Sequence, residues 1–472
     1  MVERAARVGD VKRRVLLSGI RLGALACVVL SAPAVRAEGL SEALAKAYQT
    51  NPQLNAERAR QRATDENVPQ ALAAYRPQII AGLSAGLQAV RDQLPGNVIQ
   101  TATLKPWQIG VTVTQTLFNG FKTANSVRVA ELQVQSGREA LRNVGQGVLL
   151  DAVTAYTNVL ANQTLVEAQR SNVAFLKETQ AITQRRLNAG DVTPTDTAQA
   201  EARLSRGLSD LNAAEVNLAI SQATYAQVIG NPPSQLRSAE AVDRLLPRSR
   251  EDAVGFAFRE HPAVMAAGYD VDVASTSIRV AESSLLPQVS VQGSVSRSRD
   301  SDSTLGTFGT DQASVIGQVT QPIYDGGTAS SQTRQAKEVA AQSRLVLDQV
   351  RNQAKTAAVS AWVANEGAKI AVSASESEVK AATVALAGVQ KEAAGGQRTT
   401  VDVLNSQQDL ILAKARLIGA QRDRVIASYT LLSAIGRLDV KTLVLNTPDY
   451  LPEVHYHQVR DAWQGLRTPS GQ

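Results

Sequence analysis

The chain repeats its own pattern from one half to the other. A constant offset of 206 residues relates Gly190 to Gly396 and Asp196 to Asp402, and an offset of 210 relates matching positions upstream. Further matches are Thr193 with Thr399, Tyr156 with Trp362, Ile229-Gly230 with Ile435-Gly436, Asn51-Pro52 with His261-Pro262 and Pro77-Gln78 with Pro287-Gln288. Self-similarity at a fixed period indicates an internal duplication. We therefore predict a first repeat over residues 38–239, a second over 240–436, and a C-terminal tail over 437–472.

Residues 1–37 have the features of a cleaved export signal. Basic residues at 12–14 precede an apolar run at 22–30, and a small-residue cleavage site ends at position 37. The only cysteine, Cys27, lies inside this leader, so the mature chain offers no thiol for a disulfide, a zinc site or a nucleophile. Because the leader is also rich in Lys and Arg, its removal brings the net charge of +6 close to zero. The composition thus gives no support to nucleic-acid binding.

Each repeat contains two segments in which apolar and small polar residues alternate, separated by a polar loop. The segments span about 77–91 and 107–118 in the first repeat, and about 287–298 and 312–324 in the second. Period-two alternation predicts strands with one apolar face. A soluble antiparallel sheet would show the same alternation. However, the polar face is mostly uncharged, and the lengths approach those of a tilted membrane-crossing strand, so we expect four membrane strands per chain.

Very long helices are predicted after these strands, at about 122–188 and 328–393. Each would extend about 100 Å, and the first carries apolar residues at coiled-coil spacing: Leu141, Val148, Ala152, Ala155, Val159 and Val166. Shorter helices at about 196–229 and 402–435 are expected to fold back as partners. Junctions between strands and helices are expected at Pro77, Gly120, Pro287, Gly326 and Gly327.

The predicted fold is mainly α, with a long α-helical coiled-coil barrel and a membrane β-barrel portion. Four strands cannot close a barrel in lipid, where open sheet edges are not tolerated. We therefore expect a homotrimer whose strands form a barrel of roughly 12 strands. The alternative is a soluble periplasmic coiled-coil structural or adaptor protein, which would explain the export signal and the helices but not the four strands.

The duplication, together with the sequence PIYDGG at 322–327 and GQRTTVDVL at 396–404, resembles the TolC family of outer-membrane efflux and secretion channels. The resemblance extends over essentially all of the mature chain to about residue 440. It implies a passive outer-membrane channel and not an enzyme, with its helical part in the periplasm and no cofactor. Implied partners are outer-membrane lipid, a periplasmic adaptor and an inner-membrane ABC or RND-type transporter.

The paired Gly–Asp motifs fall at turns between a long helix and its returning partner. Glycine readily adopts the left-handed conformation that ends a helix, and an acid near the next N-terminus is electrostatically favourable. The resemblance implies in addition that the turns at Gly190 and Gly396 form the periplasmic entrance and the adaptor-docking region. Asp402 of each subunit would then line the pore constriction, where three carboxylates attract cations.

Arg398 is implied by the same resemblance to latch the entrance, through hydrogen bonds to Thr195 and Asp196 of a neighbouring coiled coil. Two positions depart from the pattern of the TolC family: Asn405 stands where that pattern has a second acid, and Ala393 where it has a tyrosine. We therefore expect weaker plugging by multivalent cations and a less firmly latched entrance.

Few other residues suggest a metal-binding or catalytic site. His455 and His457 form a His-x-His pair, but a metal site needs further ligands that the sequence does not identify, so a solvated tail is expected. Neither an HExxH motif nor a GxxxxGK[ST] loop occurs. Trp107, Phe118 and Tyr324, near strand ends, are candidate interfacial anchors.

Overall fold

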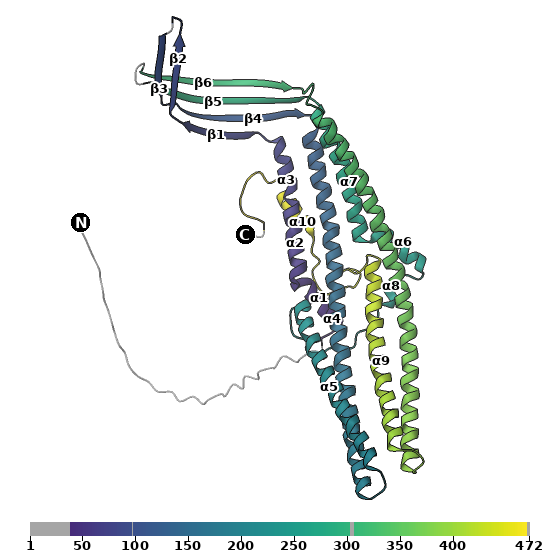
Figure 1. Cartoon of the computed structure of the whole chain (residues 1–472). Helices are drawn as coiled ribbons and strands as arrows, with labels where there is room; N and C mark the ends of the chain where they lie inside the picture. The colour runs from purple at the N-terminus through teal and green to yellow at the C-terminus, as the bar shows by residue number, and fades with distance from the viewer. Residues whose placement is uncertain (1–37, 97, 303–305, 470–472) are drawn as a thin grey trace, which may run out of the picture. The chain divides into compact units, whose positions relative to one another are not determined.

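Four long helices dominate the computed structural model, which describes residues 38–96, 98–302 and 306–469 (Figure 1). Helices α4 (Lys122–Asn188) and α8 (Thr328–Ala394) contain 67 residues each. They turn back into α5 (Pro194–Ile229) and α9 (Thr400–Ala434), respectively. All six residues of the predicted seam on α4 are buried, which confirms the coiled-coil packing. The predicted export signal lies outside the described residues.

Shorter helices precede the strands of each half. The first group is α1 (Leu40–Thr50), α2 (Pro52–Asp65), α3 (Asn67–Leu72) and the 3₁₀ turn η1 (Ala73–Tyr75); the second is η2 (Asp243–Leu245), α6 (Arg250–Glu260), α7 (Pro262–Glu282) and η3 (Ser283–Leu285). A proline at the first position of α2 and α7 explains both breaks, because proline has no N–H and is tolerated only in a first turn. The side chains of Asn51 and His261 cap these two helices.

Six strands form the sheet: β1 (Gln78–Ala85), β2 (Gln88–Leu94), β3 (Val98–Leu104), β4 (Trp107–Asn119), β5 (Gln288–Asp302) and β6 (Gly306–Thr320). The antiparallel order β1-β4-β5-β6 places the two halves of the chain side by side through β4 and β5. The prediction of a polar loop before residue 107 was wrong. That segment forms a β2–β3 hairpin, and within the described residues its pairing with β5 is limited to Leu104 and Asp302. A break at Gly86 interrupts the first predicted strand, so β1 and β2 are separate.

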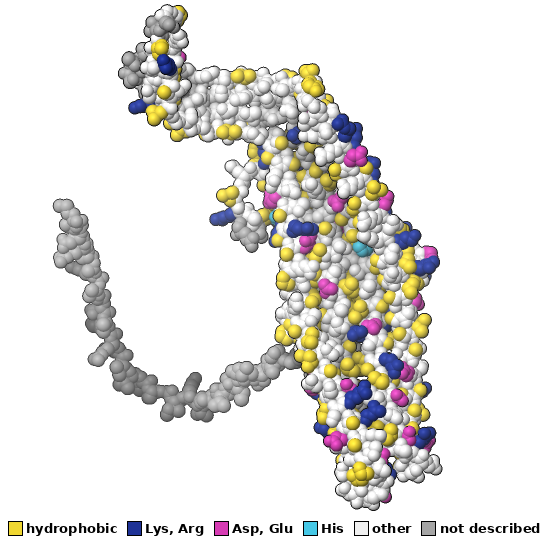
Figure 2. All heavy atoms as spheres, in the orientation of Figure 1, with side chains coloured by type: hydrophobic (Ala, Val, Ile, Leu, Met, Phe, Trp, Pro, Cys, Tyr) yellow, Lys and Arg dark blue, Asp and Glu magenta, His cyan; other side chains and the backbone are white. Residues whose placement is uncertain are grey.

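The register gives the sheet one predominantly apolar face, which also carries an ion pair between Arg297 and Asp311 beside Ile109, near the β2–β3 hairpin. Leu83 lies opposite Ile109, Val111 opposite Val295, and Val295 opposite Ala313. Small polar residues predominate on the other face, where Ser294 lies opposite both Thr112 and Ser314, although Ile80 and Ile316 also lie on this face. The large side chains of the apolar face are exposed in the single chain, among them Ile79, Leu83, Ile109, Val111, Val295, Val315 and Val319. Figure 2 shows charged side chains gathered over the helices, with almost none on the visible face between the β2–β3 hairpin and the helices.

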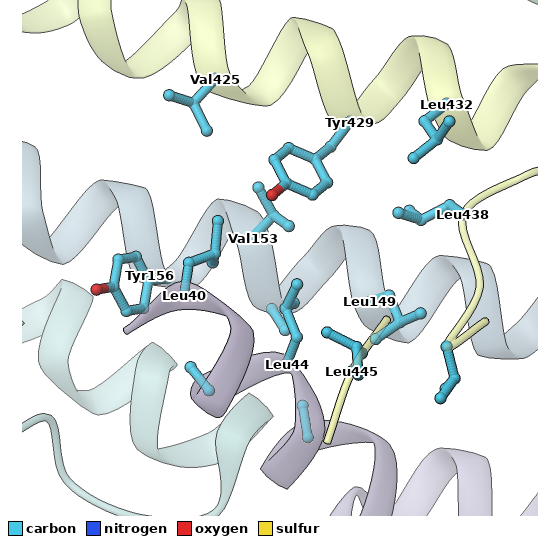
Figure 3. Close-up of a cluster of buried hydrophobic side chains, with 14 of the residues drawn as sticks. Leu40, Leu44, Leu149, Val153, Tyr156, Val425, Tyr429, Leu432, Leu438 and Leu445 are labelled. Carbon is cyan, nitrogen blue, oxygen red and sulfur yellow. The ribbon is translucent and has the colours of Figure 1, made fainter. Parts of the chain in front are cut away.

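The main hydrophobic core lies where α1, α4, the end of α9 and the segment after it meet (Figure 3). It includes Leu44, Leu149, Tyr156, Leu432 and Leu438, all of them almost completely buried. The hydroxyl of Tyr156 lies 2.9 Å from the carbonyl oxygen of Glu38 and 2.7 Å from that of Arg237. This core therefore joins the start of the described chain to α4 of the first half and α9 of the second half.

Across the described residues, the structure contains no helix with the length and apolar character needed to span a membrane.

Candidate pore entrance at the helical turns

The two turns below the long helices are built in the same way. Gly190 follows α4 with φ +84°, and the amide of Asp191 donates to the carbonyl oxygen of Arg186 at 2.9 Å. Gly396 follows α8 with φ +78°, and the amide of Gln397 donates to the carbonyl oxygen of Glu392 at 2.9 Å. Such bonds satisfy carbonyl groups left free at a helix end, and the left-handed conformation explains why a glycine occupies the same place in both turns.

The threonine and aspartate of each motif begin the returning helix. In the first turn, Thr193 donates its amide and hydroxyl to Asp196 Oδ2 at 2.9 and 2.8 Å. In the second, Thr399 donates the same two groups to Asp402 Oδ2 at 3.0 and 2.9 Å. Each aspartate amide is directed back to its threonine hydroxyl, which completes a reciprocal N-terminal cap. The recurring Thr-x-x-Asp therefore has a structural role in both turns.

These caps also hold the carboxylates in the charged form. The hydrogen bonds from Thr399 to Asp402 lower the pKa of that aspartate, and those from Thr193 do the same for Asp196. Both side chains are partly exposed to solvent at the turns. Asp402 is thus a solvent-accessible, rigidly held negative charge at the end of the helical hairpin.

Arg398 contacts its own turn in the single chain. Its Nε donates to Glu392 Oε2 at 2.9 Å, and both side chains are about half exposed. Among the described residues this is the carboxylate that the guanidinium contacts, so the structure does not bring Arg398 to Thr195 or Asp196. The latch between coiled coils stays a prediction.

A contact that sequence reasoning missed joins the two helical hairpins above the turns. The buried amide of Gln407 on α9 donates to Asn172 Oδ1 on α4 at 2.8 Å. Next to it, Arg203 on α5 donates to Asn405 Oδ1 at 2.8 Å. Leu176, Ala200 and Leu404 form a buried apolar cluster between the same helices. No pattern in the sequence pairs the two hydrogen-bonded positions, because the partners are 235 and 202 residues apart.

The strand–helix junctions are tightly built. Gly120 has φ +64°, and a Cβ there would lie 2.6 Å from the carbonyl oxygen of Ser283. Gly326 and Gly327 also have positive φ, and Asp325 accepts hydrogen bonds from the amides of Gly327 and Ala329 at the start of α8. Pro77 and Pro287 lie directly before β1 and β5. The glycines thus allow an abrupt change from strand to helix.

The C-terminal segment is not the solvated tail that was expected. It contains α10 (Pro452–Val459), which packs on α2. His455 Nδ1 lies 2.9 Å from Asp65 Oδ2, and Asp65 is completely buried. Gln61 donates to the other carboxylate oxygen at 2.9 Å. Nothing local to the tail could have predicted this contact, because Asp65 is 390 positions away.

The same arrangement of long helical hairpins and an antiparallel sheet occurs in solved structures of outer-membrane channels. The outer membrane channel CmeC of Campylobacter jejuni has this fold, with a TM-score of 0.75 at 14% identity over 89% of each chain. The outer membrane protein VceC of Vibrio cholerae has a TM-score of 0.70 at 16% identity, over 84% of this chain and 96% of that one.

Sequence comparison then identifies the family. The family model described as outer membrane efflux protein matches residues 43–231 and 256–437, and the chain belongs to this family. It is 40% identical to the outer membrane efflux protein BepC of Brucella suis, over 97% of this chain and 96% of BepC. It is 29% identical to the outer membrane protein TolC of Vibrio cholerae, over 86% and 92% of the two chains. The resemblance to the TolC family is confirmed, and the protein is located in the outer membrane.

Proposed function

We propose that this protein is a homotrimeric channel that acts as the passive exit duct of a tripartite efflux pump or a type I secretion system. The apolar face of the sheet carries this proposal. Its side chains are much more exposed than a water-facing surface favours: Ile79 is 69% exposed, Leu83 74% and Val315 80%. An apolar face backed by small polar residues suits a strand with lipid on one side and water on the other.

The edges of the sheet support assembly. In the described chain β1 pairs only with β4, and β6 only with β5, so each edge strand has one side without a neighbour. Open edges are not tolerated in lipid. Three copies would pair edge to edge and combine β1, β4, β5 and β6 of each chain into a barrel of roughly 12 strands, continued by the helices into the periplasm.

The turns would form the periplasmic entrance. Asp402 of three subunits would line the pore constriction and favour the passage of cations. In the closed trimer, Arg398 would hydrogen-bond to Thr195 and Asp196 of a neighbouring coiled coil instead of to Glu392. A periplasmic adaptor would dock around Gly190 and Gly396, and an inner-membrane ABC or RND-type transporter would supply the energy. The names of two relatives support efflux and secretion, respectively. BepC is an outer membrane efflux protein, and AprF of Pseudomonas aeruginosa, 24% identical over 71% of each chain, is an alkaline protease secretion protein.

Single-channel conductance in a planar lipid bilayer tests this proposal. Residues 38–472 are compared with the Arg398→Ser and Arg416→Ser variants. Arg416 is the matched control, because it makes a similarly exposed ion pair, to Glu378 at 2.9 Å, between α9 and α8. A small cation-selective current that grows only in Arg398→Ser supports the duct and its latch.

Other outcomes separate the parts of the proposal. Equal currents in all three proteins would contradict the role of Arg398 but leave the channel intact. Protein that remains soluble and does not insert as trimers would contradict the channel itself, and would favour a soluble periplasmic coiled-coil protein.

A further inference from the structure

The C-terminal segment, residues 446–469, extends along the outside of α2 and α3 toward the strands. The segment runs parallel to the first helices, because successive residues along it contact successive residues along them. Tyr450 contacts Arg58, His455 contacts Asp65, and Ala462 contacts Arg76. Figure 1 shows α10, in yellow, beside α2 along this path. Because Arg76 comes two residues before β1, the segment reaches a strand–helix junction at Ala462, seven residues before its described end.

The last contact holds an aromatic side chain at this junction. Arg76 Nη1 donates to the carbonyl oxygen of Ala462 at 2.8 Å, and its guanidinium carbon lies 4.6 Å from the ring centroid of Trp463. Despite this contact, Trp463 is 72% exposed, and Leu466 is fully exposed. Tyr75, beside Arg76, is also exposed. Two large aromatic side chains, Tyr75 and Trp463, are therefore exposed beside the start of the first strand, and Leu466 is exposed three residues after Trp463 along the chain.

We propose that residues 460–469 lie on the periplasmic surface of the outer membrane, with Trp463 and Leu466 inserted into the phospholipid leaflet. This inference rests on the proposed function, since the membrane boundary is at Pro77 only if the strands cross the membrane. Tryptophan favours the headgroup region, where its ring is buried and its N–H stays hydrated. Of the basic residues of this end, Arg460 pairs with Glu131 at 3.7 Å and Asp461 at 3.6 Å, and Arg76 contacts Ala462 and Trp463. The guanidinium of Arg467 is the group best suited to a phosphate headgroup.

Two apolar side chains alone would not anchor a soluble protein to a membrane. Here the strands already fix the chain in the bilayer, so the segment meets the lipid at a high effective concentration. The contacts of His455 and Arg76 further reduce the conformational entropy lost on insertion, because the segment is positioned before it meets lipid. The anchor would thus set the depth at which the helices meet the membrane.

Tryptophan fluorescence provides a direct test, because the sequence contains three tryptophans, at positions 107, 362 and 463. Phenylalanine substitutions at two of them at a time leave single-tryptophan proteins, which are reconstituted as trimers into phosphatidylcholine bilayers with and without brominated acyl chains. Trp107 begins β4 and is the reference for the proposed membrane region, and Trp362 packs on the helical core and is the reference outside it. We expect brominated lipid to reduce the emission of Trp463 and Trp107, and to leave that of Trp362 unchanged.

Each contrary result has a separate meaning. If Trp107 is quenched and Trp463 is instead quenched by aqueous iodide, the segment lies in water and the inference fails while the channel stands. If neither lipid nor iodide reaches Trp463, protein covers it, and the inference also fails. If the lipid quenches neither Trp107 nor Trp463, the membrane strands of the proposed function fail as well.

A second position keeps the test independent of tryptophan. Residues 38–472 contain no cysteine, so Leu466→Cys gives a single site for a nitroxide label on a fully exposed side chain. The label should collide more with oxygen, which concentrates in lipid, than with a water-soluble nickel chelate. The reverse preference would place residue 466 in water and overturn the inference.

Discussion

The side-chain amide of Gln407 donates to Asn172 Oδ1 at 2.8 Å inside a buried seam, and so joins α9 to α4. Gln407→Leu would leave the Asn172 carbonyl buried without this partner, which costs about 1–3 kcal/mol. We expect the protein to melt at a lower temperature, and the double variant Asn172→Leu/Gln407→Leu to lose less stability than the two single variants added together. Gln184→Leu is the control, since Gln184 bonds an exposed Asn188. Equal melting of Gln407→Leu and Gln184→Leu would show that the buried pair contributes nothing specific.

Asp196 and Asp402 cap their helices with the same hydrogen bonds, but only Asp402 is proposed to line the constriction. Asp402→Asn should reduce the preference for cations, measured as the reversal potential across a salt gradient. Asp196→Asn removes the same charge from an equivalent cap and should leave the reversal potential unchanged, although its current should grow because Asp196 is a proposed partner of Arg398. Loss of selectivity in both variants would place the first turn in the pore as well.

The two faces of β4 should differ in their tolerance of charge. Val111 lies on the apolar face opposite Val295, and Thr112 on the polar face opposite Ser294. Val111→Arg should cost about 2–4 kcal/mol of membrane stability if it faces the middle of the bilayer. Thr112→Arg would face water and should insert normally. The yield of folded trimers in the outer membrane decides the matter, and a poorer yield for Thr112→Arg would mean that the faces are assigned the wrong way round.

Asp65 should make stability depend on pH. Burial raises the pKa of Asp65 above its usual 3.8, although the hydrogen bonds from His455 and Gln61 and the charge of Arg138 act in the opposite direction. A carboxyl with a raised native pKa contributes stability that is fully present below its unfolded value and is lost as pH rises through the native value. Relative to Asp65→Asn, the wild type should therefore become less stable as pH increases from about 4. Urea unfolding at a series of pH values measures this difference.

An exposed carboxylate is the control for that series. Asp270 accepts a hydrogen bond from Ser136 at the surface, so Asp270→Asn measures how the same substitution acts at an exposed site across the series. If Asp65→Asn follows the wild-type pH dependence, the Asp65 carboxyl has the same pKa in the folded and unfolded protein.

A position can require glycine because of its backbone conformation or because a side chain has no room, and Gly396 and Gly436 allow the two causes to be compared. Both have positive φ, but a Cβ at Gly436 would lie 2.6 Å from the carbonyl oxygen of Glu260, whereas nothing lies within 4 Å at Gly396. Gly396→Ala should cost about 1–2 kcal/mol for the left-handed backbone alone. Gly436→Ala should cost clearly more, because the backbone near Glu260 must move. Thermal unfolding of both variants compares them, and equal costs would mean that this contact relaxes freely.

The mainly helical fold with its antiparallel sheet was predictable because local patterns specify it. The seam from Leu141 to Val166 has helical spacing, and the segments at 107–118 and 288–298 alternate strictly enough to assign their faces. The β2–β3 hairpin was missed because Arg91 and Asp92 interrupt its apolar alternation. Such a hairpin depends on pairing between its own two strands rather than on a buried face.

The candidate site was predictable only in part. The caps at Thr193 and Thr399 follow from local sequence, since the bonded groups are three residues apart. The contacts of Asn172 with Gln407 and of Asp65 with His455 join residues 235 and 390 positions apart. Which residues meet at such distances depends on how whole helices pack. The roles of Asp402 and Arg398 stay predictions, because they concern neighbouring subunits.

The equivalence of the two turns also bears on how the protein could have evolved. Glycine, threonine and aspartate make the same hydrogen bonds in both, so selection for folding alone can preserve these residues in each copy. Arg398 has no such counterpart, because Val192 occupies the matching position. A duplicated gene half that retains its fold can diverge at such a position without loss of stability. An ancestral protein assembled from identical halves would on this view have had equivalent turns throughout, with differences such as Arg398 acquired one side chain at a time.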